Sequence, residues 1–221
     1  MALPFTVRRL SAAEIPSHLD SLCDVLINCV EGGASVSFIL PFSPEKARAF
    51  WLNVAQSAAR DERVVLAALD EGGHVIGTVQ LVTDQPENQP HRADVSKLLV
   101  HTRARRGGVA QALMETLEQE ARKAGKTVLV LDTATGSDAE RFYSRNQWQR
   151  VGEIPHYALM PDGDTCSTTY FFKHLKIFNN SVQFDRNGVS LMFVLIAWRA
   201  FSVRGLLIIH QGTHCENIES S

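Results

Sequence analysis

Residues 103–110, RARRGGVA, form a short basic segment with two adjacent glycines, and its chemistry is that of phosphate binding. Gly107 and Gly108 would let the backbone approach a ligand closely, and the QALMETLEQEARK that follows has the apolar spacing of an amphipathic helix. Free N–H groups in a first helical turn bind anions, and guanidinium groups grip phosphate at two points. The segment therefore predicts an anion site at a helix start, with a solvated turn as the alternative. The candidate ligand-binding residues are Arg103, Arg105, Arg106, Gly107, Gly108, Val109 and Ala110.

The elements that must position this loop follow from the hydrophobic pattern. Ser11 and Glu14 have the spacing of a capping box before a helix that reaches Val30, and Pro44 begins a second helix that runs to about Arg60. A third helix follows the basic loop, and a fourth covers residues 138–146. Strands are predicted at residues 5–10, 63–69, 75–82, 94–100, 127–132, 149–153 and 168–175. This order predicts an α+β fold with a central mixed β-sheet flanked by helices.

Composition sets broad limits on the protein. The 221 residues suffice for one packed domain, which we place at residues 1–175, plus an appendage. The net charge is −2 and the pI is near 6.4, which excludes a general field for nucleic acid. The cysteines and histidines show no metal-site spacing, so we expect no metal, and no secretory segment is visible, which favours a cytoplasmic protein.

Residues 176–221 differ in character from the preceding domain. Their apolar run VSLMFVLIAWRAFSVRGLLII approaches the roughly 20 residues that cross a bilayer. Arg199 and Arg204 interrupt it, each at a cost of about 2.5–3.5 kcal/mol at a membrane centre, so we expect no spanning helix. Three interpretations stay open: an extension packed on the domain or a second subunit, a membrane-surface helix, and sequence read past the usual end of the gene, which we favour.

The basic loop fits the pattern R/Q-x-x-G-x-G/A and resembles the acyl-CoA pyrophosphate loop of the GNAT superfamily of N-acetyltransferases. Within that superfamily, the chain is similar to the tabtoxin-resistance acetyltransferases over nearly all of residues 6–175. The segments that carry this similarity are EGGASVSF, RADVSKLLV, LDTATGSDAERFYS, RVGEIPHY, PDG and YFFKHL. The resemblance implies the GNAT-type sheet and acetyl-CoA as co-substrate.

The resemblance also implies roles for individual residues. Tyr143 would be the general acid for the departing thiolate, and Asp132 or Asp94 would hold the amine or take its proton, although a glutamate is expected at position 94. The amides of Leu99 and Val100 would polarise the thioester. Gly33, Ser35 and His156 would lie on the acceptor side. Each role has a structural alternative. Tyr143 could be a tyrosine of the core, and the two aspartates could be solvated or helix-capping carboxylates. The acceptor-side residues could belong to a helix C-cap and an ordinary loop.

Three functions follow from these residues. We expect an acetyl-CoA-dependent N-acetyltransferase that acts on the amine of a small toxin or antibiotic similar to tabtoxinine-β-lactam. An aminoglycoside or another small amine is the enzymatic alternative. A catalytically silent acyl-CoA sensor is the alternative of another class, and retention of both carboxylates and Tyr143 argues against it. Neither nucleic acid nor membrane is an expected partner, and a homodimer stays open.

Overall fold

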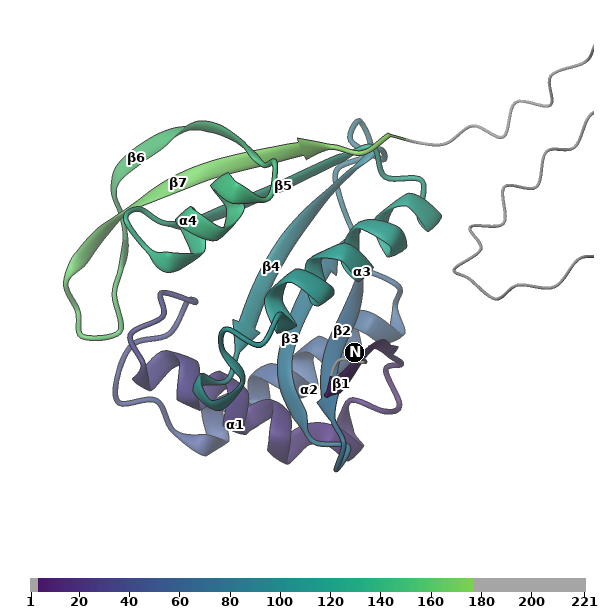
Figure 1. Cartoon of the computed structure of the whole chain (residues 1–221), viewed down its shortest axis with the longest axis vertical. Helices are drawn as coiled ribbons and strands as arrows, with labels where there is room; N and C mark the ends of the chain where they lie inside the picture. Colours follow the sequence, from purple (N-terminus) through teal and green to yellow (C-terminus); the bar gives the residue numbers. More distant parts are fainter. Residues whose placement is uncertain (1–3, 177–221) are drawn as a thin grey trace, which may run out of the picture. The chain divides into compact units, whose positions relative to one another are not determined.

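The computed structural model describes residues 4–176, which contain one seven-stranded sheet and four α-helices (Figure 1). The strand order is β1-β2-β3-β4-β5-β7-β6, and every neighbouring pair is antiparallel except β4 and β5. The predicted mixed sheet flanked by helices is therefore confirmed. The strands are β1 (Phe5–Leu10), β2 (Arg63–Asp70), β3 (Val75–Val82), β4 (Arg92–Val100), β5 (Val128–Ala134), β6 (Gln149–Leu159) and β7 (Thr165–His174). The helices are α1 (Leu19–Glu31), α2 (Pro44–Ala59), α3 (Val109–Lys123) and α4 (Asp138–Arg145).

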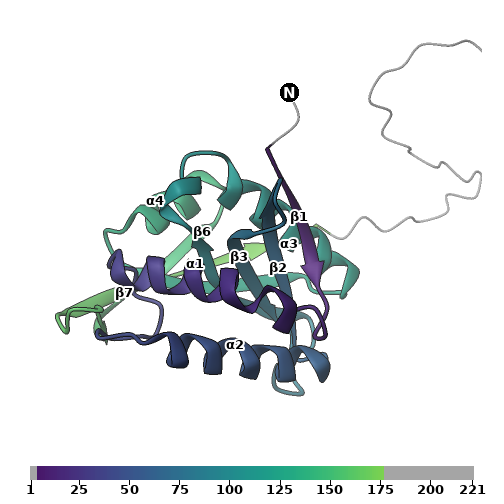
Figure 2. The ribbon, with the colours of Figure 1, turned by 90° about the horizontal axis from the view of Figure 1, so that it is seen from below.

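Two hydrophobic cores lie on opposite faces of the sheet. The apolar stripe of α3 packs with one face, and the apolar sides of α1 and α2 pack with the other. Figure 1 shows α3 in front of the sheet, and Figure 2 shows α1 and α2 running side by side on the other side. The run VVLAAL in β2 is buried throughout because alternate residues enter the two cores.

A bulge at Lys97 redirects β4. The β3 partners change from Gln80 opposite Ser96 to Thr78 opposite Leu99, and Lys97 has a left-handed φ of 54°. Val95 is buried in the core under α3, whereas Leu99 is buried in the core under α1 and α2. In a regular strand these two residues would face the same side, so one extra residue has turned the end of β4 over.

The parallel pairing of β4 with β5 is short. It joins Arg92, Ala93 and Asp94 to Val128, Leu129 and Val130, and then stops. β5 stays paired with β7 as far as Ala134, while β4 diverges (Figure 1). The edge of β4 that faces β5 is consequently unpaired after Asp94, and the basic loop lies at the end of this edge.

Two of the predicted element boundaries were wrong. The Ser11–Glu14 capping box is present, with Glu14 Oε2 accepting from the Ser11 N–H at 2.9 Å, but α1 begins only at Leu19. Pro16 cannot donate a helical hydrogen bond, and a short 3₁₀ turn, Pro16–His18, intervenes. β6 does not end at Glu153: after an irregularity around His156, which has a φ of 51°, pairing with β7 resumes at Ala158 opposite Cys166.

The expectations about the C-terminal extension fall on residues outside the described part of the chain, apart from Lys176. Among the helices of residues 4–176, none is long and apolar enough to cross a membrane.

Candidate active site

The start of α3 presents a row of unused backbone N–H groups. The first helical hydrogen bond runs from the Ala112 N–H to the Gly108 carbonyl at 3.0 Å. From Arg106 to Gln111, no backbone N–H donates a hydrogen bond within the described residues. Gly108 caps the helix with a φ of 83° and no side chain, so nothing shields these donors. This geometry fits the phosphate groups of a nucleotide-like cofactor.

Close packing fixes the position of this helix start on the sheet. A Cβ atom on Gly77 of β3 would lie only 2.8 Å from Val109 Cγ1 and 3.1 Å from the Leu99 carbonyl oxygen. Glycine at this position therefore lets the first turn of α3 approach β3 closely, next to the Leu99 carbonyl of β4.

The three arginines of the basic loop do not act alike. Arg103 Nη2 lies 3.8 Å from Asp70 Oδ2, and Arg105 Nε donates to the Val100 carbonyl at 3.3 Å. Arg106 makes no side-chain hydrogen bond or ion pair within residues 4–176, and its φ is 61°. Arg105 thus ties the loop to β4, and Arg106 is the guanidinium best placed to meet a ligand.

Of the two amides predicted to polarise the thioester, that of Val100 faces the free edge of β4. The His101 N–H donates to the Ile76 carbonyl of β3 at 3.0 Å. Because successive residues of a strand direct their N–H groups to opposite edges, the Val100 N–H points away from β3. Leu99 is 2% exposed and pairs with Thr78 of β3, so its amide points the other way.

The two candidate carboxylates have different surroundings. Asp94 is ion-paired with Arg92, and its Oδ2 accepts from Gln85 Nε2 at 3.1 Å. Asp132 is exposed and accepts one hydrogen bond within the described residues, from Thr168 Oγ1 at 2.9 Å. Asp132 therefore has the fewer polar contacts of the two carboxylates, and Asp94 is held by its neighbours.

Tyr143 is almost completely buried, with 6% of its surface exposed. Its ring centroid lies 5.7 Å from that of Trp148 and 6.0 Å from that of Phe171. Burial, assisted by the negative charge of Asp132, raises the pKa of the phenol well above its usual value. The hydroxyl thus stays protonated at neutral pH and can act only as an acid.

The three predicted acceptor-side residues come from two segments that touch each other. Ser35 Oγ lies 3.4 Å from the Leu159 carbonyl oxygen, and His156 Nδ1 lies 3.5 Å from Thr165 Oγ1. The Leu40 N–H donates to the Pro161 carbonyl at 2.8 Å. The segment between α1 and α2, which includes Gly33, therefore contacts the β6–β7 hairpin.

The sequence model of the Acetyltransferase (GNAT) family matches residues 34–147, a range that includes the basic loop, the two candidate carboxylates and Tyr143. The chain belongs to the GNAT family. A relative from Azospirillum brasilense, named as an uncharacterized N-acetyltransferase in the hisH-hisA intergenic region, is 32% identical over 130 residues, or 58% of this chain and 74% of that protein. The family and its relatives make the chain an acetyl-CoA-dependent acyltransferase.

Solved structures share this fold at low sequence identity. The yncA acetyltransferase of Salmonella typhimurium, solved with its cofactor acetyl-CoA, has a TM-score of 0.62 and 18% identity over 78% of this chain and 95% of its own. The ribosomal-protein-alanine N-acetyltransferase of Brucella melitensis has a TM-score of 0.60 and 25% identity over 77% of this chain and 99% of its own. These likenesses show that the chain shares the fold of solved acetyltransferases.

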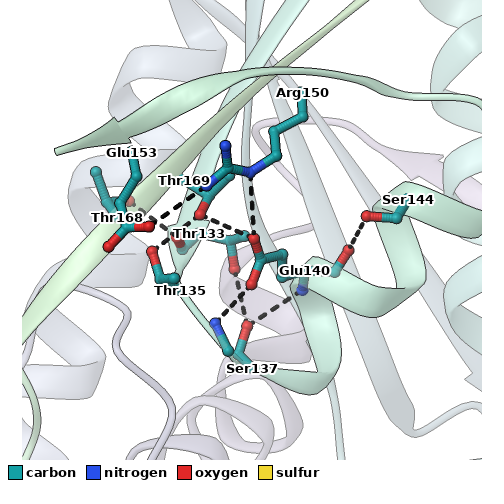
Figure 3. Close-up of polar contacts among 10 residues, drawn as sticks. Thr133, Thr135, Ser137, Glu140, Ser144, Arg150, Glu153, Thr168 and Thr169 are labelled. Atoms are coloured by element: carbon teal, nitrogen blue, oxygen red, sulfur yellow. Dashed lines mark hydrogen bonds and ion pairs between the residues drawn. The ribbon is translucent and has the colours of Figure 1, made fainter.

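A polar network holds the helix that carries Tyr143 of this GNAT domain (Figure 3). Ser137 caps α4 by accepting from the Glu140 N–H at 3.2 Å. The Glu140 carboxylate accepts from the Gly136 N–H at 2.5 Å and from Thr169 Oγ1 of β7 at 2.9 Å. Arg150 of β6 approaches the same carboxylate at 3.7 Å. The network joins α4 to the strands beside it and so positions Tyr143.

Replacing Glu140 by glutamine should lower the free energy of unfolding by about 1–2 kcal/mol at pH 7. The hydrogen bond from the Gly136 N–H is the main reason that the pKa of Glu140 lies below its usual value. Because the folded-state pKa is depressed, this stabilisation is present above the unfolded-state pKa, about 4.3, and is lost as pH falls through the folded-state pKa. Urea unfolding of the wild-type protein and of Glu140→Gln, at pH 7 and at pH 3, measures the stability difference at each pH.

The matched control is Glu153→Gln, which removes a carboxylate whose side-chain contact is an exposed ion pair with Arg150 at 3.4 Å. We expect a change of under about 1 kcal/mol there. A Glu140→Gln effect of the same size at both pH values would contradict the charge-based account.

Sequence reasoning missed two groups near Asp132. Tyr170 is the partner of Asp132 across β5 and β7, and its hydroxyl lies 2.9 Å from that of Tyr157. This hydrogen bond, helped by partial burial and the charge of Asp132, raises the pKa of Tyr170 to about 12. The other group is Lys97, on the bulge of β4. The alternation of side chains along the strand YFFKHL indicates that Tyr170 and Phe172 share one face of the sheet. Only the β5–β7 register shows that Asp132 lies on that face as well.

Within residues 4–176, no cluster of three or more histidine, cysteine, aspartate or glutamate side chains is arranged to hold a metal ion.

Proposed function

We propose that this GNAT enzyme acetylates the amine of a small toxin or antibiotic with an amino-acid-like head group, of the tabtoxinine-β-lactam type. The observation that carries the proposal is the position of Asp132. This carboxylate is exposed, lies on β5 just beyond the point where β4 separates from it, and shares a sheet face with Tyr170. An acceptor ammonium group bound there would lie beside the unpaired edge of β4.

Different groups of the protein would bind the different parts of acetyl-CoA. The N–H groups from Arg106 to Gln111, with the Arg106 guanidinium, would hold the pyrophosphate of acetyl-CoA. The unpaired edge of β4 would pair with the pantetheine arm. Acetyl-CoA supplies the thioester, and the Val100 N–H would stabilise the negative charge that develops on its carbonyl oxygen.

Two side chains would move the protons. Asp132 would hold the ammonium group and accept its proton, directly or through a water, so that the nitrogen lone pair can form the new C–N bond. As the C–S bond breaks, the Tyr143 hydroxyl would donate a proton to the sulfur. The nitrogen would then release its second proton through water, which restores the Tyr143 hydroxyl, and the proton on Asp132 would leave to solvent. Asp94, paired with Arg92, would add negative charge near the amine without serving as the base.

The two alternative functions, an aminoglycoside acetyltransferase and an acyl-CoA sensor, predict different carboxylates around the acceptor. An aminoglycoside carries several ammonium groups and calls for several free carboxylates, but one of the two candidate carboxylates here is already paired with Arg92. A silent sensor would bind acetyl-CoA without needing an exposed carboxylate beside a protonated tyrosine. The small amino-acid-like amine is the better match to a site with one free carboxylate.

The test is acetyl transfer by the purified full chain. The enzyme is offered acetyl-CoA with tabtoxinine-β-lactam, a panel of aminoglycosides and a panel of amino acids, and thiol release and product mass are followed. We expect a singly acetylated toxin and its loss in Asp132→Asn. Acetylated aminoglycoside would support the enzymatic alternative. Bound acetyl-CoA with no acetylated product would support the sensor and refute the proposal.

A further inference from the structure

Lys97 lies at the bulge of β4 with its ammonium group turned toward α2 and the segment before it. Its Nζ is 2.9 Å from Ser37 Oγ and 6.0 Å from the centroid of the Phe50 ring. The left-handed φ of Lys97 belongs to the bulge, so the backbone itself aims this side chain. The bulge that separates β4 from β5 therefore also places a cation on the acceptor side.

The Lys97 ammonium group has no carboxylate within 4.0 Å among the described residues. Burial lowers the pKa of Lys97; the negative charge of Asp132, from farther away, works against this effect, and the positive charge of Arg63 adds to it. Arg63 in turn is bound by the neutral groups Ser57 Oγ and Gln80 Oε1, both at 2.8 Å. Lys97 thus has no close counter-ion, whereas the charge of Glu62 acts on Arg63.

Gln80 adds an unused hydrogen-bond donor to the same face. Its side chain is fully buried, and it lies opposite Ser96, the residue before Lys97. The amide oxygen is fixed by the hydrogen bond from Arg63, which leaves Nε2 buried without an acceptor in the described part of the chain. A buried donor without an acceptor is costly, so the interior of this face lacks one acceptor group at Gln80 Nε2.

We infer that Lys97 binds a carboxylate of the acceptor, so that the enzyme recognises a zwitterionic substrate through two opposite charges. Lys97 would take the carboxylate and Asp132 the ammonium group of the same molecule. The inference rests on the proposed function and goes further, because it names the residue that separates amino acids from simple amines. A lysine over an aromatic ring and beside a hydroxyl is a preformed site for one carboxylate.

The experiment compares tabtoxinine-β-lactam with its carboxamide, which keeps the amine and lacks the negative charge. In Lys97→Met the KM for the acid should rise about 10- to 100-fold, the size of one lost charge-assisted hydrogen bond. The KM for the carboxamide, the KM for acetyl-CoA and kcat should change little. Lys97→Glu should invert the preference and favour the carboxamide, and Lys97→Arg should retain the preference for the acid.

Lys46→Met is the matched control, because Lys46 is exposed on α2 and its side chain makes no hydrogen bond or ion pair within residues 4–176. Equal losses on both acceptors in Lys97→Met, with no inversion in Lys97→Glu, would overturn the inference and leave the proposed function standing. A wild-type enzyme that binds acetyl-CoA but acetylates neither molecule would instead refute the proposed function, and the inference with it.

Discussion

Replacing Tyr143 by phenylalanine is expected to lower kcat by about 100-fold or more, the contribution of a positioned general acid. Phenylalanine keeps the ring that packs against Trp148 and Phe171, so the fold and the affinity for acetyl-CoA should persist. What is lost is the one proton donor on α4 that burial keeps protonated. Steady-state kinetics, with acetyl-CoA binding by calorimetry, separate the two effects.

The pH profile gives a second readout for the same residue. Because the pKa of Tyr143 is raised, the wild-type kcat should not fall as pH passes the ordinary phenol pKa of about 10 through ionisation of this group. Phe171→Leu is the packing control: it disturbs the same ring cluster, at about 1 kcal/mol of stability, and leaves the hydroxyl in place. Wild-type kcat in Tyr143→Phe would show that this residue is a core tyrosine alone.

Replacing Gly108 by alanine is expected to weaken acetyl-CoA binding by about 10- to 100-fold. A Cβ atom at this position would have open space around it, with no protein atom beyond the neighbouring residues within 4 Å, and we expect it to occupy space that the pyrophosphate needs. There it would hold the pyrophosphate away from donors worth about 1.5–3 kcal/mol for each hydrogen bond to a charged group. Titration calorimetry with acetyl-CoA measures the change directly.

Gly125→Ala separates this effect from backbone strain. Gly125 follows the other end of the same helix, has a φ of 69°, and also has open space around its Cβ position. Both substitutions impose a left-handed conformation on alanine, at roughly 1–2 kcal/mol. We expect the two variants to have similar melting temperatures, and only Gly108→Ala to bind acetyl-CoA more weakly. Equal affinities in the two variants would mean that the N–H row does not bind the cofactor.

The features predicted correctly from sequence are those that depend on neighbouring residues. The Ser11–Glu14 capping box is formed by side chains within three residues of the amides that they bind, and α2 begins at Pro44 as predicted. The basic loop and α3 are contiguous in the sequence, so the glycines and the helical periodicity that follows sufficed to predict the row of free N–H groups. The family resemblance supplied the reaction, which periodicity could not.

The relations between strands were beyond sequence reasoning. Asp94 and Asp132 looked equivalent as strand-end carboxylates, but the fold places Gln85 and Arg92 around Asp94 and leaves Asp132 exposed. The extension of β6 past Glu153 depends on pairing with β7, which continues across an irregular stretch. Strand pairing of this kind stabilises the fold only when the partner strand is in register, and the register is not visible in the sequence of one strand.

By itself, the sequence determined the local chemistry of this protein: an anion-binding loop at the start of a helix, its caps, and the residue types able to move protons. Only the tertiary structure decided which of those residues act together. The bulge at Lys97 turns over the end of β4 and places a cation beside Ser37 and Phe50, and the β5–β7 register sets Tyr170 beside Asp132. Local chemistry depends on residues close in the chain, whereas a shared site depends on strand register, which long-range packing sets.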